Sequence, residues 1–184
     1  MSTKRNDKKR RVGKIGSKAP GSQAEESPVV KNGWTLYAHP LILDQIDRLK
    51  AKARREAEPQ GDATKVLAWV AEAIFDTIPQ DPTREMYRQG HTLGKDYTHW
   101  FRDHYAGRFR LFFRYSSAAK TIIFAWVNDD QSLRTYGAKN DAYAVFKGML
   151  DGGNPPDKWE DLLKEASTAE AKKRLKKSQS DRTR

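Results

Sequence analysis

Residues 107–116, GRFRLFFRYS, alternate in chemistry with a period of two. One set of alternate positions is apolar or aromatic and contains Phe109, Leu111, Phe113 and Tyr115. The other set contains Arg108, Arg110 and Arg114, with Phe112 among them. Because successive side chains of a β-strand point to opposite faces, this pattern predicts a strand with one face in a core. Its other face presents arginines, whose like charges need a partner.

Two more strand-like segments flank this one. HWFRDHYA, at residues 99–106, precedes it across Gly107, and KTIIFAWVN, at residues 120–128, follows after a short turn. Short turns join antiparallel neighbours, so the three segments should form an antiparallel sheet. The apolar run from Ile122 to Val127 is typical of a strand that is covered on both faces.

Helical periodicity occurs on both sides of these strands. An apolar stripe with helical spacing follows Pro40, and a second begins after Asp62, the expected N-cap of its helix. Two such helices joined by a short turn predict a helical hairpin. Segments 139–150 and 157–166 are also helical in pattern. The sequence therefore predicts an α+β domain, with an N-terminal helical hairpin packed on a small antiparallel β-sheet and C-terminal helices.

The net charge of +11 resides in the two ends of the chain, because residues 1–31 carry +6 and residues 166–184 carry +5. The first segment has too few apolar side chains to offset the entropy cost of ordering it. We therefore expect a disordered basic tail at 1–30, a domain at 31–168 and a basic C-terminal tail at 169–184. A cationic surface on the domain has to come from a local arrangement of side chains.

Several classes of protein are excluded by what the sequence lacks. It contains no cysteine, which excludes disulfides and thiolate metal sites. Its four histidines lack the spacing of a zinc-binding helix, and neither a nucleophile elbow nor a glycine-rich phosphate loop occurs. No secretory signal and no membrane-spanning run is visible. We expect a cytoplasmic protein that uses no metal or other cofactor and does not enter a membrane.

The remaining chemistry is a concentration of Arg, Lys, His and Tyr between residues 95 and 143. Guanidinium groups fork onto phosphate oxygens, and aromatic rings stack on unpaired bases. In RNA the 2′-hydroxyl can attack its own adjacent phosphate, so a protein needs only to transfer protons and stabilise the transition-state charge. Alternatively, the arginines pair with acidic neighbours on a solvated sheet face. The residues alone favour neither reading.

A longer series of motifs resembles a known family. From NGWTLYAHP, which begins at Asn32, to about Ala166, the chain is similar to the YhaV family of type II toxins, within the RelE/ParE-like superfamily. The resemblance rests on NGWTLYAHP, HTLG, GRFRLFFRYS, LRTYG, DAY and the later PP and W. Both basic ends lie outside it. It implies a RelE-like fold, in agreement with the hairpin and sheet that periodicity predicts.

The resemblance also implies an activity and partners. The expected protein is an endoribonuclease toxin that cleaves mRNA during translation. A cognate antitoxin of the AbrB-like, swapped-hairpin type would hold it inactive, and the complex would bind operator DNA and repress its own operon. The alternative is a noncatalytic RelE/ParE-like protein that acts on gyrase or DNA. A degenerate toxin that keeps only antitoxin and operator binding is a third possibility.

Candidate site residues come from the superfamily's pattern together with the local basic residues. The expected catalytic residues are Arg108, Arg110 and Tyr143, of which Arg110 matches the strand arginine and Tyr143 the C-terminal tyrosine. The expected RNA-binding residues are Arg102, Arg114, Arg134 and Lys139. Some relatives use a C-terminal histidine that has no counterpart here. His99 and His104 are therefore not expected to be catalytic, and the general base is unassigned.

Overall fold

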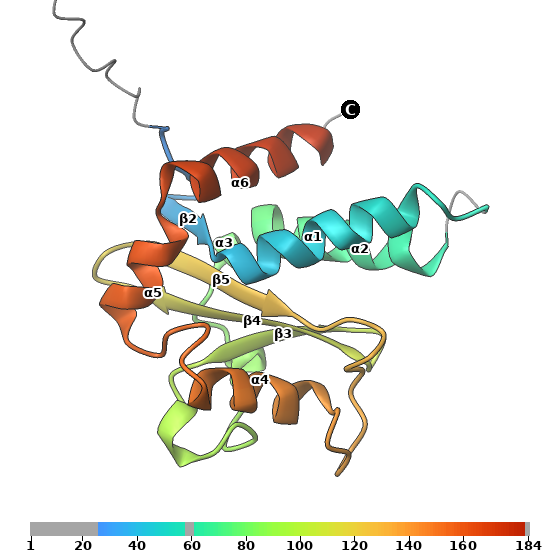
Figure 1. The fold of residues 1–184 in the computed structure, drawn as a ribbon. Coiled ribbons are helices and arrows are strands. Elements are labelled where there is room, and N and C mark those ends of the chain that lie inside the picture. Colours follow the sequence, from blue (N-terminus) through green and yellow to red (C-terminus); the bar gives the residue numbers. More distant parts are fainter. Residues whose placement is uncertain (1–25, 58–60, 183–184) are drawn as a thin grey trace, which may run out of the picture.

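The structure, a computed structural model, describes residues 26–57 and 61–182, in which helices cover both faces of a five-stranded sheet (Figure 1). The strands are β1 (Val29–Lys31), β2 (Trp34–Ala38), β3 (Phe101–Tyr105), β4 (Phe109–Ser116) and β5 (Thr121–Val127). The α-helices are α1 (Pro40–Ala53), α2 (Asp62–Glu72), α3 (Ile78–Gln80), α4 (Ala142–Asp151), α5 (Trp159–Ala166) and α6 (Ala169–Arg182). Shorter turns are the π-helical η1 (Ala73–Thr77) and the 3-10 helices η2 (Glu85–Tyr87) and η3 (Lys95–Tyr97). The α+β class is confirmed.

The sheet has the strand order β1-β2-β5-β4-β3. Strands β3, β4 and β5 are antiparallel neighbours, as the short turns predict. β2 lies parallel to β5, and β1 pairs antiparallel with β2. The expectation of a purely antiparallel sheet is therefore wrong. The parallel contact joins segments that are distant in the sequence, with α1, α2 and two other strands between them, so no local pattern reports it.

β4 divides its side chains between two cores, and the predicted alternation is confirmed. Leu111 and Phe113 are buried in the core beneath α1 and α2, whereas Phe112 is buried in the core beneath α4. β5 is buried along its whole length, also as predicted. A bulge shifts the register between β4 and β5. Phe112 pairs with Trp126, whereas the next residue, Phe113, pairs with Phe124. Arg110 and Arg114 share the α4 side of the sheet with Phe112.

α1 and α2 pack on each other and on the same face of the sheet. The N-cap expected at Asp62 is wrong, because Asp62 is the first residue of the helix and Gly61 is the N-cap. The free N–H groups of the first turn are satisfied instead by the carboxylate of Glu56. It accepts from the N–H of Ala63 at 2.7 Å and from that of Thr64 at 3.1 Å. Glu56 thereby joins the end of α1 to the start of α2.

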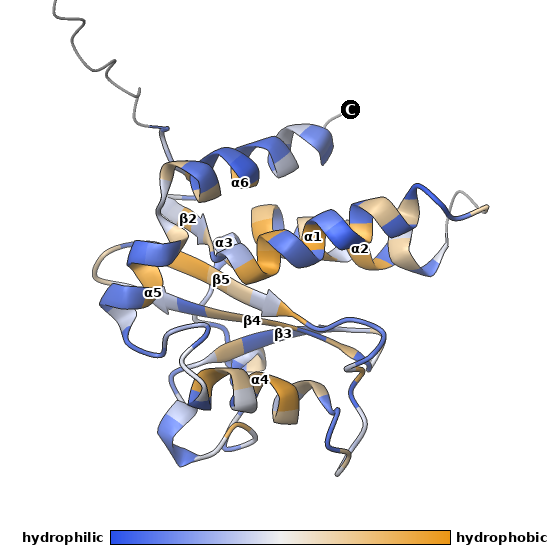
Figure 2. Cartoon of the chain, in the orientation of Figure 1, coloured by the Kyte–Doolittle hydropathy of each residue, from blue (hydrophilic) through white to orange (hydrophobic). Residues whose placement is uncertain are grey.

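The basic C-terminal segment is a helix that packs on the domain, not a free tail. Figure 2 shows that α6 is hydrophilic along most of its length. Its two buried side chains, Ala171 and Leu175, enter the core beside α1. Arg174 forms ion pairs with Asp44 at 2.8 Å and with Asp47 at 2.7 Å. Part of the charge of this segment is therefore neutralised by α1. The N-terminal tail expected at 1–30 lies mostly outside the described residues.

His39 connects the start of α1 to α5 and is almost completely buried, at 2% exposure. Its Nδ1 accepts from the N–H of Leu41 at 3.2 Å, which makes His39 the side-chain cap of α1. Its Nε2 lies 2.7 Å from a carboxylate oxygen of Glu165, to which it donates. Both bonds require the neutral tautomer with its proton on Nε2. Burial lowers the pKa of His39 from 6.5, although the hydrogen bond to Glu165 opposes this shift.

We expect the free energy of unfolding to fall with pH below 6.5 because of His39. The unfolded chain takes up a proton at the ordinary pKa, whereas the folded protein takes it up only at lower pH. The contribution is therefore complete above pH 6.5 and is lost as the pH falls toward the folded pKa. Urea unfolding from pH 7.5 to about 5 measures it. His39→Asn keeps a capping oxygen but cannot titrate, so its stability should fall less steeply. Identical slopes for the two proteins would contradict the assignment.

Candidate active site

The register of β3 and β4 places three cationic or titratable side chains on the α4 face of the sheet. His104 is paired with Arg110, and Arg102 is paired with Phe112. Paired residues in antiparallel strands present their side chains on the same face. His104 lies close to Arg102 as well, because its Nδ1 is 3.4 Å from a terminal nitrogen of that guanidinium. The strands therefore gather these groups beside the N-terminus of α4.

Arg110 has no carboxylate partner among the described residues. One terminal nitrogen donates to the carbonyl of Phe109 at 2.8 Å. The Nε of Arg110 is buried and finds no acceptor. The guanidinium carbon lies 5.9 Å from the centre of the Tyr143 ring. A partly exposed guanidinium without a carboxylate partner is one that a bound anion stabilises.

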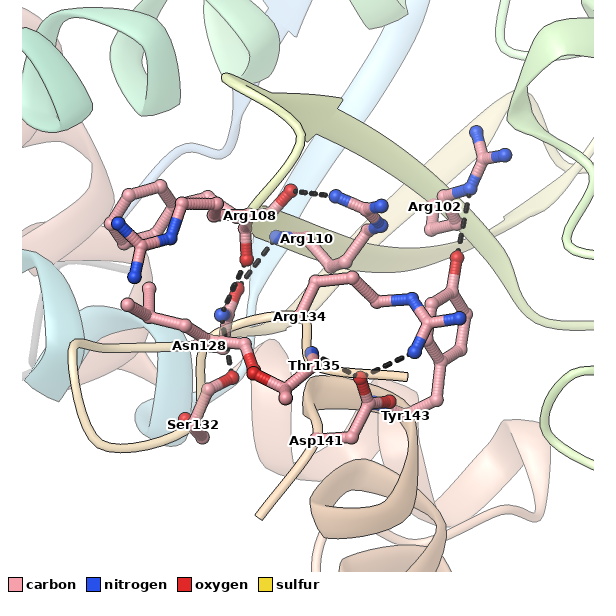
Figure 3. A network of polar contacts seen from close by, with 11 residues as sticks. Arg102, Arg108, Arg110, Asn128, Ser132, Arg134, Thr135, Asp141 and Tyr143 are labelled. Atoms are coloured by element: carbon pink, nitrogen blue, oxygen red, sulfur yellow. Dashed lines mark hydrogen bonds and ion pairs between the residues drawn. The ribbon is translucent and has the colours of Figure 1, made fainter. Parts of the chain in front are cut away.

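Tyr143 joins the arginines of the site and is 7% exposed. Its hydroxyl accepts from the Nε of Arg102 at 3.1 Å (Figure 3). The guanidinium of Arg134 lies 5.0 Å from its ring, and the edge-on ring of Phe112 supports it at 5.5 Å. The exposed surface of the ring is small, so Tyr143 positions guanidiniums more readily than it stacks on a base. We refer to Arg102, Arg110, Arg134 and Tyr143 as the arginine site.

The loop from β5 to α4 holds Arg134 in place through Asp141. Asp141 caps α4 by accepting from the N–H of Tyr143 at 3.0 Å, and its other oxygen forms a close ion pair with Arg134. That second oxygen also accepts from the N–H of Thr135 at 2.7 Å. One carboxylate thus orients the helix, the loop and the guanidinium together.

Asn128 ties the same loop to the turn between β3 and β4. This buried amide accepts from the N–H of Arg110 at 2.6 Å. It donates to the carbonyl of Arg108 at 3.1 Å and to that of Ser132 at 2.7 Å (Figure 3). The backbone that carries Arg110 is therefore fixed before any ligand binds.

Three of the expected residues lie outside the arginine site. Arg108 is exposed in the turn, and Figure 3 shows its side chain directed away from Arg110 and Tyr143. Lys139 is exposed on the loop before α4. Arg114 lies farther along β4, between the rings of Trp100 at 5.5 Å and Trp159 at 5.4 Å.

The surroundings of Arg114 indicate a packing role. It donates to the carbonyl of Asp157, which leads into α5. Burial lowers its pKa from the ordinary arginine value, although the charge of Asp157 opposes the shift. The expected assignment of Arg114 to RNA binding therefore has no geometric support, because the side chain fastens α5 to the sheet.

Three residues complete the site: Asn128 and Asp141, which sequence reasoning missed, and His104, which it considered but set aside as a catalytic residue. The strand register offered a signal for His104, since it lies two positions from Arg102 on the same strand. Asp141 stands where an N-cap precedes the helix that begins with Ala142, another readable signal. No local pattern identifies Asn128, because its partners come from a distant turn.

Other features of the described chain do not belong to this site. No group of three or more His, Asp or Glu side chains is arranged to hold a metal ion in residues 26–57 and 61–182. No helix among the described residues is long and apolar enough to cross a membrane. A cavity of about 620 Å³ lies between α1, α2 and the end of α6, lined by side chains such as Ile46, Leu67 and Phe75. These side chains are on the other face of the sheet from the arginine site.

A cationic site with an embedded tyrosine, on the sheet of a small α+β domain, is suited to binding an anionic backbone such as that of a nucleic acid. A family model described as a toxin with endonuclease activity, of a toxin-antitoxin system, matches residues 36–167. The chain therefore belongs to the YhaV toxin family, and it is the endonuclease toxin of such a system.

Curated relatives agree with this assignment. The chain is 46% identical over 145 residues to Toxin YhaV of Escherichia coli O6:H1, covering 73% of this chain and 92% of the relative. It is 45% identical over 145 residues to Ribonuclease toxin YhaV of Escherichia coli (strain K12), with the same coverage. No solved structure matches the chain. The family match ends at residue 167, so α6 lies outside it.

Proposed function

We propose that this ribonuclease toxin cleaves single-stranded mRNA without a metal ion, by directing the 2′-hydroxyl of one nucleotide onto its own 3′-phosphate. The observation that carries the proposal is the partly exposed guanidinium of Arg110, which has no carboxylate partner among the described residues. A phosphate group would supply the missing negative charge and accept from the terminal nitrogens of the guanidinium. As the phosphorus becomes five-coordinate, the added negative charge strengthens the same contact.

The other residues of the site have separable roles in this reaction. Arg102 forms the second contact to the phosphate, and the hydroxyl of Tyr143 holds its Nε in place. Arg134 and Lys139 bind the neighbouring phosphates of the strand. Arg108, exposed at the turn, contacts RNA farther from the cleaved bond. Arg114 is left out of the RNA site because tryptophan rings enclose it.

His104 is the group placed to accept the proton of the 2′-hydroxyl. Its side chain is exposed next to that of Arg110, and its Nδ1 makes only a long contact of 3.4 Å to Arg102, which a substrate hydroxyl can replace. The bond from the 2′-oxygen to phosphorus forms as the bond from phosphorus to the 5′-oxygen breaks. The products are a 2′,3′-cyclic phosphate and a 5′-hydroxyl, whose proton comes from solvent.

The toxin's partners follow from its family. Membership of a toxin-antitoxin system implies a cognate antitoxin and an RNA substrate. We propose that the antitoxin is of the AbrB-like, swapped-hairpin type, that the complex represses its own operon by binding operator DNA, and that cleavage takes place on mRNA during translation in the cytoplasm. The RelE-like assignment of the fold belongs to the same proposal, supported by helices α1 and α2 against the sheet.

We expect replacement of the 2′-hydroxyl by hydrogen at the cleaved nucleotide to abolish cleavage, because the nucleophile is then missing. Purified protein is incubated with an RNA oligonucleotide that carries the deoxynucleotide there or, as the control, several nucleotides away. EDTA should leave the rate unchanged, and the products should carry cyclic phosphates. Cleavage of the deoxy-substituted bond would indicate attack by water instead of the 2′-hydroxyl, and loss of activity in EDTA would indicate that a metal ion is required. Failure to cleave any RNA would favour a noncatalytic binding protein.

A further inference from the structure

We infer that Tyr136 forms a nucleobase-binding site, in which its exposed ring stacks on an unpaired RNA base next to the cleaved phosphate. This inference rests on the proposed ribonuclease function and adds a binding residue that neither the sequence nor the family match assigns. Tyr136 is 93% exposed, compared with 58% for Val30 and 52% for Met86, the other exposed large apolar side chains of the described chain.

Tyr136 lies in a turn whose backbone is held by hydrogen bonds. The N–H of Ala138 donates to the carbonyl of Thr135 at 3.1 Å, which closes a turn with Tyr136 and Gly137 at its centre. Gly137 has a φ of +79°, the left-handed conformation that this position of a type II turn requires. Asp141 anchors the base of the turn by accepting from the N–H of Thr135 at 2.7 Å. The turn is therefore ordered without any contribution from burial of the ring.

Arg134 connects Tyr136 to the arginine site, because its guanidinium contacts the rings of both Tyr136 and Tyr143. The guanidinium of Arg134 lies 5.2 Å from the centre of the Tyr136 ring and 5.0 Å from that of the Tyr143 ring. The inner tyrosine is buried, whereas the outer one is open to solvent. A base that stacked on the outer ring would therefore lie near Arg134, which contacts both tyrosines.

The chemistry of the ring defines the ligand as an unpaired base of a single strand. Stacking on an aromatic side chain needs a free base face, which a duplex does not offer. Because every base has such a face, the ring contributes affinity and position but little base selectivity. Removal of one stacking ring typically weakens binding by about 5- to 150-fold.

The test measures stacking directly with an uncleavable RNA. The full chain is titrated onto a single-stranded oligonucleotide with a deoxynucleotide at the cleaved position and 2-aminopurine at one of the adjacent positions in turn. We expect the wild-type protein to quench the fluorescence at one of these positions. Tyr136→Ala should remove the quenching, weaken binding by about tenfold or more, and slow cleavage of the natural RNA. Tyr136→Phe should retain all three properties, since stacking uses the ring.

Val30→Ala is the matched control, because Val30 is also exposed and lies on β1, the strand farthest from β3 in the sheet. It should leave quenching and cleavage unchanged. Wild-type binding, quenching and cleavage by Tyr136→Ala would overturn the base site while leaving the ribonuclease function intact. Loss of quenching in Tyr136→Phe would also overturn it, by assigning the contact to the hydroxyl. An inactive wild-type protein would overturn both proposals together.

Discussion

Arg110→Ala is expected to lower the rate of RNA cleavage by about 10²–10³, the usual effect of removing a group that stabilises charge in a transition state. The protein should remain folded, because the guanidinium makes one hydrogen bond, to the carbonyl of Phe109, and its Nε makes none. Arg110→Lys should recover little activity, since a single ammonium cannot reproduce the planar fork of donors. The measurement pairs single-turnover cleavage of an RNA oligonucleotide with the melting temperature of each variant.

Arg108→Ala is the matched control for this prediction. Arg108 has the same side chain two residues away on the same segment, but it is exposed and directed away from Tyr143. We expect a cleavage rate within about tenfold of wild type, because loss of one peripheral phosphate contact mainly weakens binding in a salt-dependent way. Equal losses in the two variants would mean that both arginines reach the phosphate, as the sequence pattern predicted. Full activity of folded Arg110→Ala would overturn the site.

Much of the fold could be predicted from the sequence because its signals are local. The alternation along β4, the apolar run of β5 and the short turns between them each reflect one strand or one turn. The parallel contact of β2 with β5 has no such signal, since it depends on how two helices and two strands fold back between them. The packing of α6 on the domain has no strong local signal in the sequence either. Its sequence is dominated by basic side chains, and only Ala171 and Leu175 attach it to the core.

Only part of the site could be predicted from the sequence, because motifs identify residue types but not the direction of their side chains. Arg110 and Tyr143 were identified by family motifs, and the structure brings them together with Arg102 and Arg134. Motifs do not report which arginine of a strand and turn faces the site. That depends on the pairing of β3 with β4, which turns Arg110 toward the α4 face and leaves Arg108 in the turn. Arg114 lies on the same α4 face as Arg110, but farther along β4, where its guanidinium contacts Trp100 and Trp159.

The second large effect concerns the core beneath the site. Phe112 is fully buried, and its ring stacks on Phe146 with 4.2 Å between the ring centres. It also lies 6.0 Å from Trp126 and supports Tyr143 edge-on at 5.5 Å. Truncation of a buried phenylalanine leaves a cavity and typically costs ~3–5 kcal/mol of stability. For a domain of this size, that corresponds to a loss of roughly 6–20 °C in melting temperature.

Phe112→Ala should therefore lower the free energy of unfolding, measured in urea, more than Phe109→Ala does. Phe109 is the matched control because the same atoms are removed from the same strand, but its ring is only partly buried and lies on the opposite face. Phe112→Ala should also cleave RNA more slowly at a temperature where it is still folded, because Tyr143 loses the ring that supports it. Phe109→Ala should cleave at the wild-type rate per folded molecule. Equal stability losses would show that Phe112 contributes no more to stability than the partly buried Phe109. Wild-type cleavage by folded Phe112→Ala would show that the α4 core does not set the position of Tyr143.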